Sequence, residues 1–167
     1  MYRIALLVLA GCPAVGGGGG SLTEIPELPT HQGCGDTLIF AVSADDTVQV
    51  RFQADGAVED AYAGTTDATW DPALTLTLDR GNRLSERNCT DFIDVVNGDV
   101  PEVYETWTAI SGTVTTSITP TAATYGECNA PADAVLHLAD VVFESPTGEQ
   151  LTVESLDVEI DVGWCAG

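Results

Sequence analysis

The sequence of 167 residues contains no lysine, and its basic side chains are five arginines, set against 26 aspartates and glutamates. The resulting formal net charge is −21 at pH 7. A surface this acidic repels the phosphates of nucleic acids and of anionic lipids, which argues against a nucleic-acid-binding function. Histidine is also scarce, with two residues. The sequence contains no C-x-x-C motif and no Cys/His cluster, so it predicts no zinc site.

Signatures of catalysis are missing as well. No serine lies in a G-x-S-x-G motif, so the nucleophile elbow of hydrolases is absent. The spacing of the acidic residues picks out no pair for glycoside hydrolysis. Of the two histidines, His31 is expected to be an exposed residue of the N-terminal segment, and His137 a partly buried structural residue. The sequence therefore predicts a protein that is not an enzyme and that carries no cofactor.

What the chain does contain is apolar residues, 44% of the total, and they recur with a period of two. The stretch 47–54 (TVQVRFQA) alternates apolar and polar side chains, and the stretches 74–79 and 134–164 repeat the pattern. Such alternation is typical of half-buried strands, and helical periodicity is nearly absent. We therefore expect an all-β fold, namely a single antiparallel β-sandwich or small barrel of about eight strands, braced by disulfides.

Turn signals divide this pattern into hairpins. Short clusters of Asp, Gly and Pro predict turns at 44–46, around Gly81 and at 146–148. Two longer stretches without alternation, 55–73 and 120–133, are expected to be loops, and the first could contain a short helix.

Two irregularities are expected inside the strands. Gly112 interrupts an apolar face to which Ile110 and Val114 belong, and it predicts a bulge or a strand crossing. In the stretch after residue 150 the apolar residues change from odd to even positions. An extra residue would flip the faces, which predicts a second bulge near 154–155.

An apolar run from Ile4 to Ala10 is followed by Gly11 and Cys12. The run is shorter than the ~20 residues that span a bilayer, and it has the layout of a secretory signal. Its end, LAGC at Leu9–Cys12, resembles the lipobox of bacterial lipoproteins. The resemblance implies that the Cys12 thiol is lipidated, that the chain is cleaved just before it, and that the new amino group is acylated with a fatty acid such as palmitate. The alternative is a conventional signal peptide in which this cysteine occurs by chance.

The residues after Cys12 suit a spacer between a membrane anchor and a folded body. The glycines at 16–20 cannot bury side chains, and two prolines within 22–30 stiffen the segment. Pro13 stands where an aspartate would favour the inner membrane, so the resemblance implies the outer membrane of a bacterial envelope. The chain is thus expected to have three parts, a signal peptide, a tether and a β-domain, over 1–11, 12–33 and 34–167.

The four cysteines of the body are widely spaced, and in an exported chain such cysteines predict two disulfides. The expected directions of the antiparallel strands place Cys128 and Cys165 at one edge of the sheet, and Cys34 and Cys89 at the other. Cysteines at opposite ends of strands are too far apart to pair. We therefore predict the disulfides Cys34–Cys89 and Cys128–Cys165, with the two other pairings left open.

Two acidic stretches are the remaining candidates for a ligand site. Calcium takes about six to eight oxygen ligands, and the first stretch offers carboxylates that could converge on it, namely Asp55, Asp60, Asp67 and Asp71. The second stretch spans 91–102. Neither matches the EF-hand pattern, and ordinary solvated loops are the alternative for both.

The leading interpretation is a non-enzymatic envelope lipoprotein with a structural or binding role, whose protein or glycan partner stays open. The alternatives are a lipocalin-like carrier of a small apolar ligand and a carbohydrate- or calcium-binding surface module. An exposed Trp70 could stack on sugars, whereas core packing is expected for Trp107 and Trp164. The segment 111–160 also resembles the endings of small β-rich lipoproteins that have no assigned activity.

Overall fold

The computed structural model describes residues 22–34, 38–54, 64–67, 74–89, 100–120 and 129–164. In these ranges the chain forms β-strands and one short 3-10 helix, η2, and no helix there is long and apolar enough to cross a membrane. The elements in chain order are β1 (Thr30–Cys34), β2 (Leu38–Val42), β3 (Val48–Ala54), β4 (Gly64–Asp67), β5 (Leu74–Asn82), η2 (Leu84–Arg87), β6 (Glu102–Pro120), β7 (Asn129–Glu144) and β8 (Gln150–Trp164).

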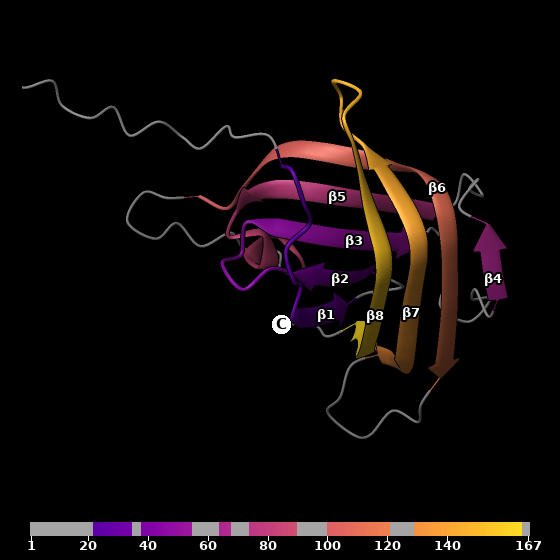
Figure 1. Cartoon of the computed structure of the whole chain (residues 1–167). Coiled ribbons are helices and arrows are strands. Elements are labelled where there is room, and N and C mark those ends of the chain that lie inside the picture. The colour runs from indigo at the N-terminus through magenta and orange to yellow at the C-terminus, as the bar shows by residue number, and fades with distance from the viewer. Residues whose placement is uncertain are drawn as a thin grey trace, which may run out of the picture.

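All of these strands belong to one antiparallel sheet, which confirms the all-β fold expected from the alternating pattern. The strand order is β1-β2-β3-β5-β6-β7-β8, and β4 lies off this path, paired with β6. The sheet is curled: β1, β2, β3 and β5 run together in one layer, and β7 and β8 cross in front of it at a steep angle (Figure 1). One continuous sheet therefore supplies both layers, and the strands at its two ends, β1 and β8, lie close to each other.

The two layers meet at a crease, which we define as residues 109–113 of β6 and 139–141 of β7. The side chains that face the core change parity at this level. In β6 the buried residues are odd-numbered before the crease, as at Trp107, and even-numbered after it, as at Val114. In β7 they are even-numbered up to Leu138 and odd-numbered from Val141. The β6–β7 register shifts twice within the crease, as expected for a bulge at Gly112.

Gly112 is required at the crease by its conformation and by its surroundings. Its φ is 115°, in the left-handed region that favours glycine. A Cβ atom added at this position would lie 2.4 Å from the Cα of Val141 and 2.6 Å from the carbonyl oxygen of Asp140. Both are backbone atoms, so no side-chain rotation could make room.

The prediction of a bulge near 154–155 of β8 is wrong. The β7–β8 register continues without a shift from the pair Ala139 and Ser155 to the pair Val141 and Val153. In β7, too, the buried apolar residues change from even to odd positions at this level, where Asp140 has a φ of 53°. Because both strands change face together, neither needs an extra residue.

The folded body begins earlier than the expected boundary at residue 34. Strand β1 starts at Thr30, and His31, expected to be an exposed residue of the tether, is half-buried opposite Ala41 of β2. Leu28, just before β1, is only 8% exposed and belongs to the core. The last part of the expected tether, 22–33, is therefore part of the folded body.

Other local expectations also differ from the structure. Strand β4 lies within the expected loop 55–73, and β7 already starts at Asn129, within the expected loop 120–133. Gly81 is not in a turn but inside β5, next to a register shift with β6. Ile110 is 41% exposed, so it does not share the buried face of Val114. The hairpin turns at 44–46 and 146–148 form as expected.

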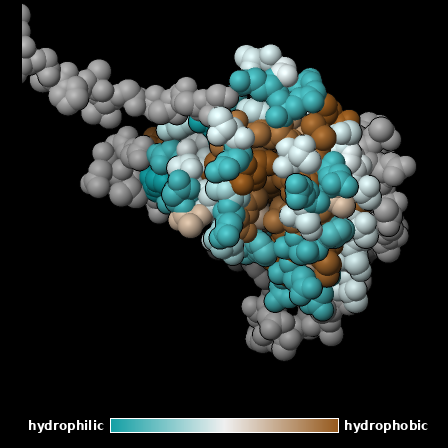
Figure 2. All heavy atoms as spheres, viewed as in Figure 1, coloured by the Kyte–Doolittle hydropathy of each residue, from teal (hydrophilic) through white to brown (hydrophobic). Residues whose placement is uncertain are grey.

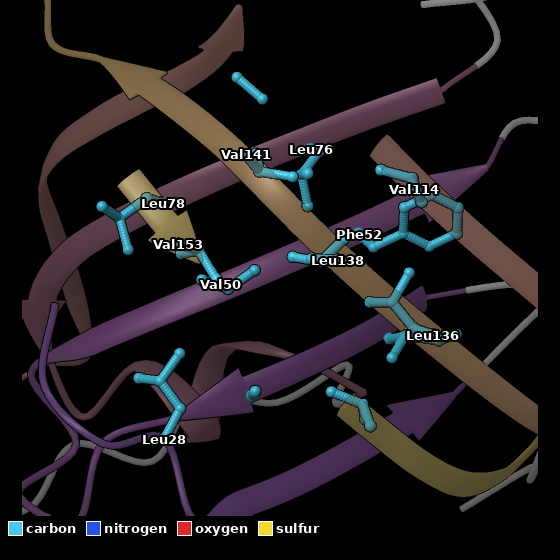
Figure 3. Packing of buried hydrophobic residues seen from close by; sticks show 14 of the residues in the cluster. Leu28, Val50, Phe52, Leu76, Leu78, Val114, Leu136, Leu138, Val141 and Val153 are labelled. Atoms are coloured by element: carbon cyan, nitrogen blue, oxygen red, sulfur yellow. The ribbon is translucent and has the colours of Figure 1, made fainter. Parts of the chain in front are cut away.

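The hydrophobic core fills the space between the two layers. Figure 3 shows side chains of β3 and β5, including Val50 and Leu78, meeting those of β7 and β8, including Leu138 and Val153. Trp107 is 1% exposed, which confirms that it packs in the core. On the outside, hydrophilic residues cover much of the face in Figure 2, with a seam of hydrophobic residues between them.

Candidate functional site

Most residues singled out for chemistry from the sequence lie outside the described residues: Cys12, Asp55, Asp60, Asp71, Cys128 and Cys165. Asp67 is at the end of β4, where its backbone pairs with Thr113 of β6. Within the described ranges no group of three or more His, Cys, Asp or Glu side chains is placed to hold a metal ion. Calcium binding therefore stays a prediction.

The disulfide between Cys34 and Cys89 is formed, with a Cα–Cα distance of 5.5 Å. It joins the end of β1 to the chain just after η2 and closes a long loop, with a sequence separation of 55. The second expected pair, Cys128–Cys165, stays a prediction. The described residues next to these cysteines in sequence, Asn129 and Trp164, are partners across β7 and β8.

His137 lies in a strand, β7, as expected. Its Nδ1 lies 2.6 Å from Oδ1 of Asp157, its partner across β7 and β8. Both side chains are solvent-accessible, with exposed fractions of 42% and 72%. This is an exposed cross-strand pair on the outer surface, and among the described residues no third His, Cys, Asp or Glu side chain joins it to form a metal site.

The helix η2 lies on the outer face of the layer that contains β2, β3 and β5, where it contacts β3 and β6. Strand β2 (LIFAV) is buried on both faces, with Ile39 turned to the core and Phe40 to the outer side. Leu84 of η2 is 1% exposed. Asp46, in the β2–β3 turn, accepts hydrogen bonds from the backbone N–H and the hydroxyl of Ser85, both at 2.8 Å. These bonds fasten η2 to the hairpin.

The β2–β3 turn that holds η2 is itself tied by Asp45. Its Oδ1 accepts hydrogen bonds from the hydroxyls of Ser43, at 2.7 Å, and Thr47, at 2.8 Å. These two bonds hold the pKa of Asp45 below its ordinary value, because they favour the charged carboxylate. A lowered pKa stabilises the fold fully above the pKa of the unfolded chain, and this contribution is lost as the pH falls from there through the lower pKa of the folded protein.

Replacing Asp45 with asparagine should therefore lower the melting temperature at pH 7 by a few degrees at most, since the group is exposed. The difference from the wild type should be smaller at about pH 3, because the wild-type carboxylate is by then largely protonated in the unfolded chain, which removes part of its contribution to the native state. Melting curves at both pH values measure this. Asp161→Asn makes the same charge change at another exposed acid. A difference that is the same at both pH values would contradict the role of Asp45.

A pocket of about 300 Å³ lies between η2 and the outer face of this layer. We call it the η2 pocket, and most of its lining is polar: Gln49, Arg51, Asp79, Arg87 and Asn88. Its floor comes from β3 and β5, and its rim from the end of η2 and the residues after it. The disulfide at Cys89 fixes that end of the rim.

A chain of hydrogen bonds orders the floor of the η2 pocket. Thr106 of β6 donates to Oδ1 of Asp79 at 2.8 Å, and Gln49 donates its amide to Oδ2 at 3.4 Å. Asn88 in turn donates to the amide oxygen of Gln49 at 2.6 Å. Gln49 and Asp79 are only 2% and 4% exposed. Two buried polar side chains with shared partners form a rigid floor.

The two arginines of the η2 pocket differ from the other described arginines. Arg80 pairs with Glu105, and Arg83 pairs with Glu86. Arg51 donates from Nη2 to the amide oxygen of Gln53 at 2.6 Å, while its buried Nε has no hydrogen-bond partner. No carboxylate among the described residues forms an ion pair with Arg51 or with Arg87.

Sequence reasoning missed the η2 pocket. Gln49 and Arg51 lie on the polar face of β3, which alternation assigns to solvent. One signal was available, the unbroken apolar run LIFAV at 38–42, because a strand that is apolar on both faces must be covered on both. The run does not say which residues cover it.

Comparison with known proteins finds no matching family model, no matching curated protein and no matching solved structure.

Proposed function

We propose that this protein is a lipid-anchored protein of the bacterial envelope, whose β-domain has a non-enzymatic binding or structural role. The observation that carries the proposal is the position of Cys12, which follows an apolar run and a Leu-Ala-Gly triplet and precedes a run of glycines. In that position a cysteine resembles the lipidated residue of a lipobox. More than one acyl chain on it would give stable anchoring, whereas a single chain binds only marginally.

The Cys34–Cys89 disulfide supports an exported location. Disulfides form and persist in oxidising compartments such as the periplasm and the cell surface, and they are rare in the cytosol.

The described interior favours a binding or structural domain over a lipocalin-like carrier. An apolar ligand needs an apolar cavity of roughly 300 Å³ or more. The space between the layers is instead occupied by large side chains, among them Trp107, Phe52 and Phe143, each at most 1% exposed. Trp107 is also too deeply buried to stack on a sugar. The η2 pocket, which is mostly polar, suits a polar ligand better than an apolar one.

The anchor is tested by Cys12→Ser, with Gly11→Ala as a matched control that keeps a small residue before the cysteine. The serine variant should leave the membrane fraction and lose the acyl mass, while the control should stay lipidated, since only the thiol can receive the diacylglyceryl group. Fractionation and mass spectrometry of the N-terminal peptide measure both. If the wild type carries no acyl mass at Cys12 and the serine variant still fractionates with membranes, the proposal fails.

A further inference from the structure

We propose that the η2 pocket binds a small hydroxylated carboxylate, whose anionic group is held by Arg51 and Arg87. This inference deepens the binding role proposed above and rests on that role, but it does not depend on the lipid anchor.

The first step is the placement of positive charge. The described residues contain four arginines in a chain of net charge −21. Two of them are paired with glutamates, and the two that have no ion pair with a described carboxylate line the same pocket. Two guanidinium groups that line one pocket and pair with no described carboxylate give that lining a positive charge, which suits an anion.

The second step is the unsatisfied donor on Arg51. Its Nε is buried and has no hydrogen-bond partner, although such a group normally costs stability when unpaired. The hydrogen bond from Nη2 to Gln53 holds the guanidinium in a fixed orientation at the pocket. A planar guanidinium matches a carboxylate in geometry and charge, and charge-assisted hydrogen bonds are among the strongest in proteins.

The third step concerns the rest of the ligand. Asp79 lines the pocket and accepts one hydrogen bond on each oxygen, from Thr106 and from Gln49. A carboxylate has about four acceptor sites, so Asp79 keeps capacity for ligand hydroxyls. Two arginines and one aspartate sum to a formal charge of +1, which suits a monoanion better than a phosphate dianion. The volume, about 300 Å³, accommodates a molecule the size of a single sugar acid.

Isothermal titration of the full chain in a neutral detergent tests the ligand class with three probes: glucuronate, glucose and inorganic phosphate. Ionic strength must be matched, because added salt also screens the self-repulsion of the chain. Glucuronate should bind about tenfold or more tightly than either of the others, since it combines one carboxylate with hydroxyls. Equal binding of glucose, equal or tighter binding of phosphate, or no binding of any probe would overturn the proposal.

Variants then test the residues. Arg51→Gln and Arg87→Gln should each weaken glucuronate binding about tenfold, whereas Arg80→Gln, an equal charge change at an arginine paired with Glu105, should leave it within about twofold. Because Arg87 is exposed, its variant remains informative if Arg51→Gln does not fold. Equal weakening by Arg80→Gln would overturn the proposal, since it would show only a general effect of charge. If the pocket proposal fails in these experiments, the proposal of a lipid anchor at Cys12 still stands, because membrane release is measured separately.

Discussion

Gly112→Ala should lower the free energy of unfolding by about 3 kcal/mol, a large share of the ~5–15 kcal/mol that folds a typical domain. A left-handed φ in a residue with a side chain costs on the order of 1–3 kcal/mol, and forcing a methyl group into packed structure costs about as much again. At Gly112 both apply, because its φ is 115° and the added Cβ would meet the backbone of Val141 at 2.4 Å. Thermal melting should show a loss of roughly 6–12 °C.

Gly148→Ala is the matched control for this prediction. Gly148 also has a positive φ, 86°, but no atom lies within 4 Å of the position of an added Cβ. Its replacement should therefore lower the free energy of unfolding only by the cost of the left-handed backbone conformation, about 1 kcal/mol. If the two alanine variants lose equal stability, the close approach of β6 and β7 at the crease contributes nothing, and the prediction is wrong.

Replacing both Cys34 and Cys89 with serine removes the disulfide and should lower the free energy of unfolding by about 4 kcal/mol. The bridge closes a loop with a sequence separation of 55, and the unfolded chain gains the corresponding entropy when it is cut. Urea denaturation of the wild type and the double variant measures the loss at equal protein concentration.

The same experiment repeated with a reductant provides its control. Reductant should destabilise the wild type more than the double variant, and any effect left in the double variant reports the predicted bridge Cys128–Cys165. A double variant as stable as the oxidised wild type would contradict the stabilising role of Cys34–Cys89.

The all-β fold could be predicted because alternation follows from the pleat of a half-buried strand. Two strands escaped this reasoning for a physical reason. Strand β4 (GTTD) has no apolar side chain, and β1 (THQGC) has only Cys34. Both join the sheet through backbone hydrogen bonds, which leave no trace in the hydrophobic pattern. The sequence boundary at residue 34 was therefore placed too late.

The change of phase in β8 shows another limit. The shift from Leu151 to Leu156 is visible in the sequence, but one strand cannot reveal whether its neighbour shifts as well. The matching change at Asp140 of β7 turned an expected bulge into a bend shared by both strands.

The η2 pocket was beyond prediction because its residues are far apart in the chain. Arg51 and Asp79 come from different strands, and Asn88 is brought to them by the contacts of Asp46 with η2 and by the disulfide at the next residue, Cys89. Alternation identifies Arg51 as polar, but it cannot distinguish a residue facing solvent from one facing a covered pocket. The disulfide at Cys89, in contrast, could be proposed from the expected strand directions, although these left the two other pairings open.

The place of the Cys34–Cys89 bridge also determines how the domain carries mechanical load. Consider a force that pulls on the chain before β1 while β6, β7 or β8 is held in place. This force reaches Cys34 after only the short strand β1. From there the tension passes through the sulfur atoms to Cys89 and bypasses β2, β3, β5 and η2. These elements form the η2 pocket together with the bridge. The backbone of β3 and β5, which forms the floor of the pocket, would therefore carry none of this tension while the N-terminal end of the domain is stretched.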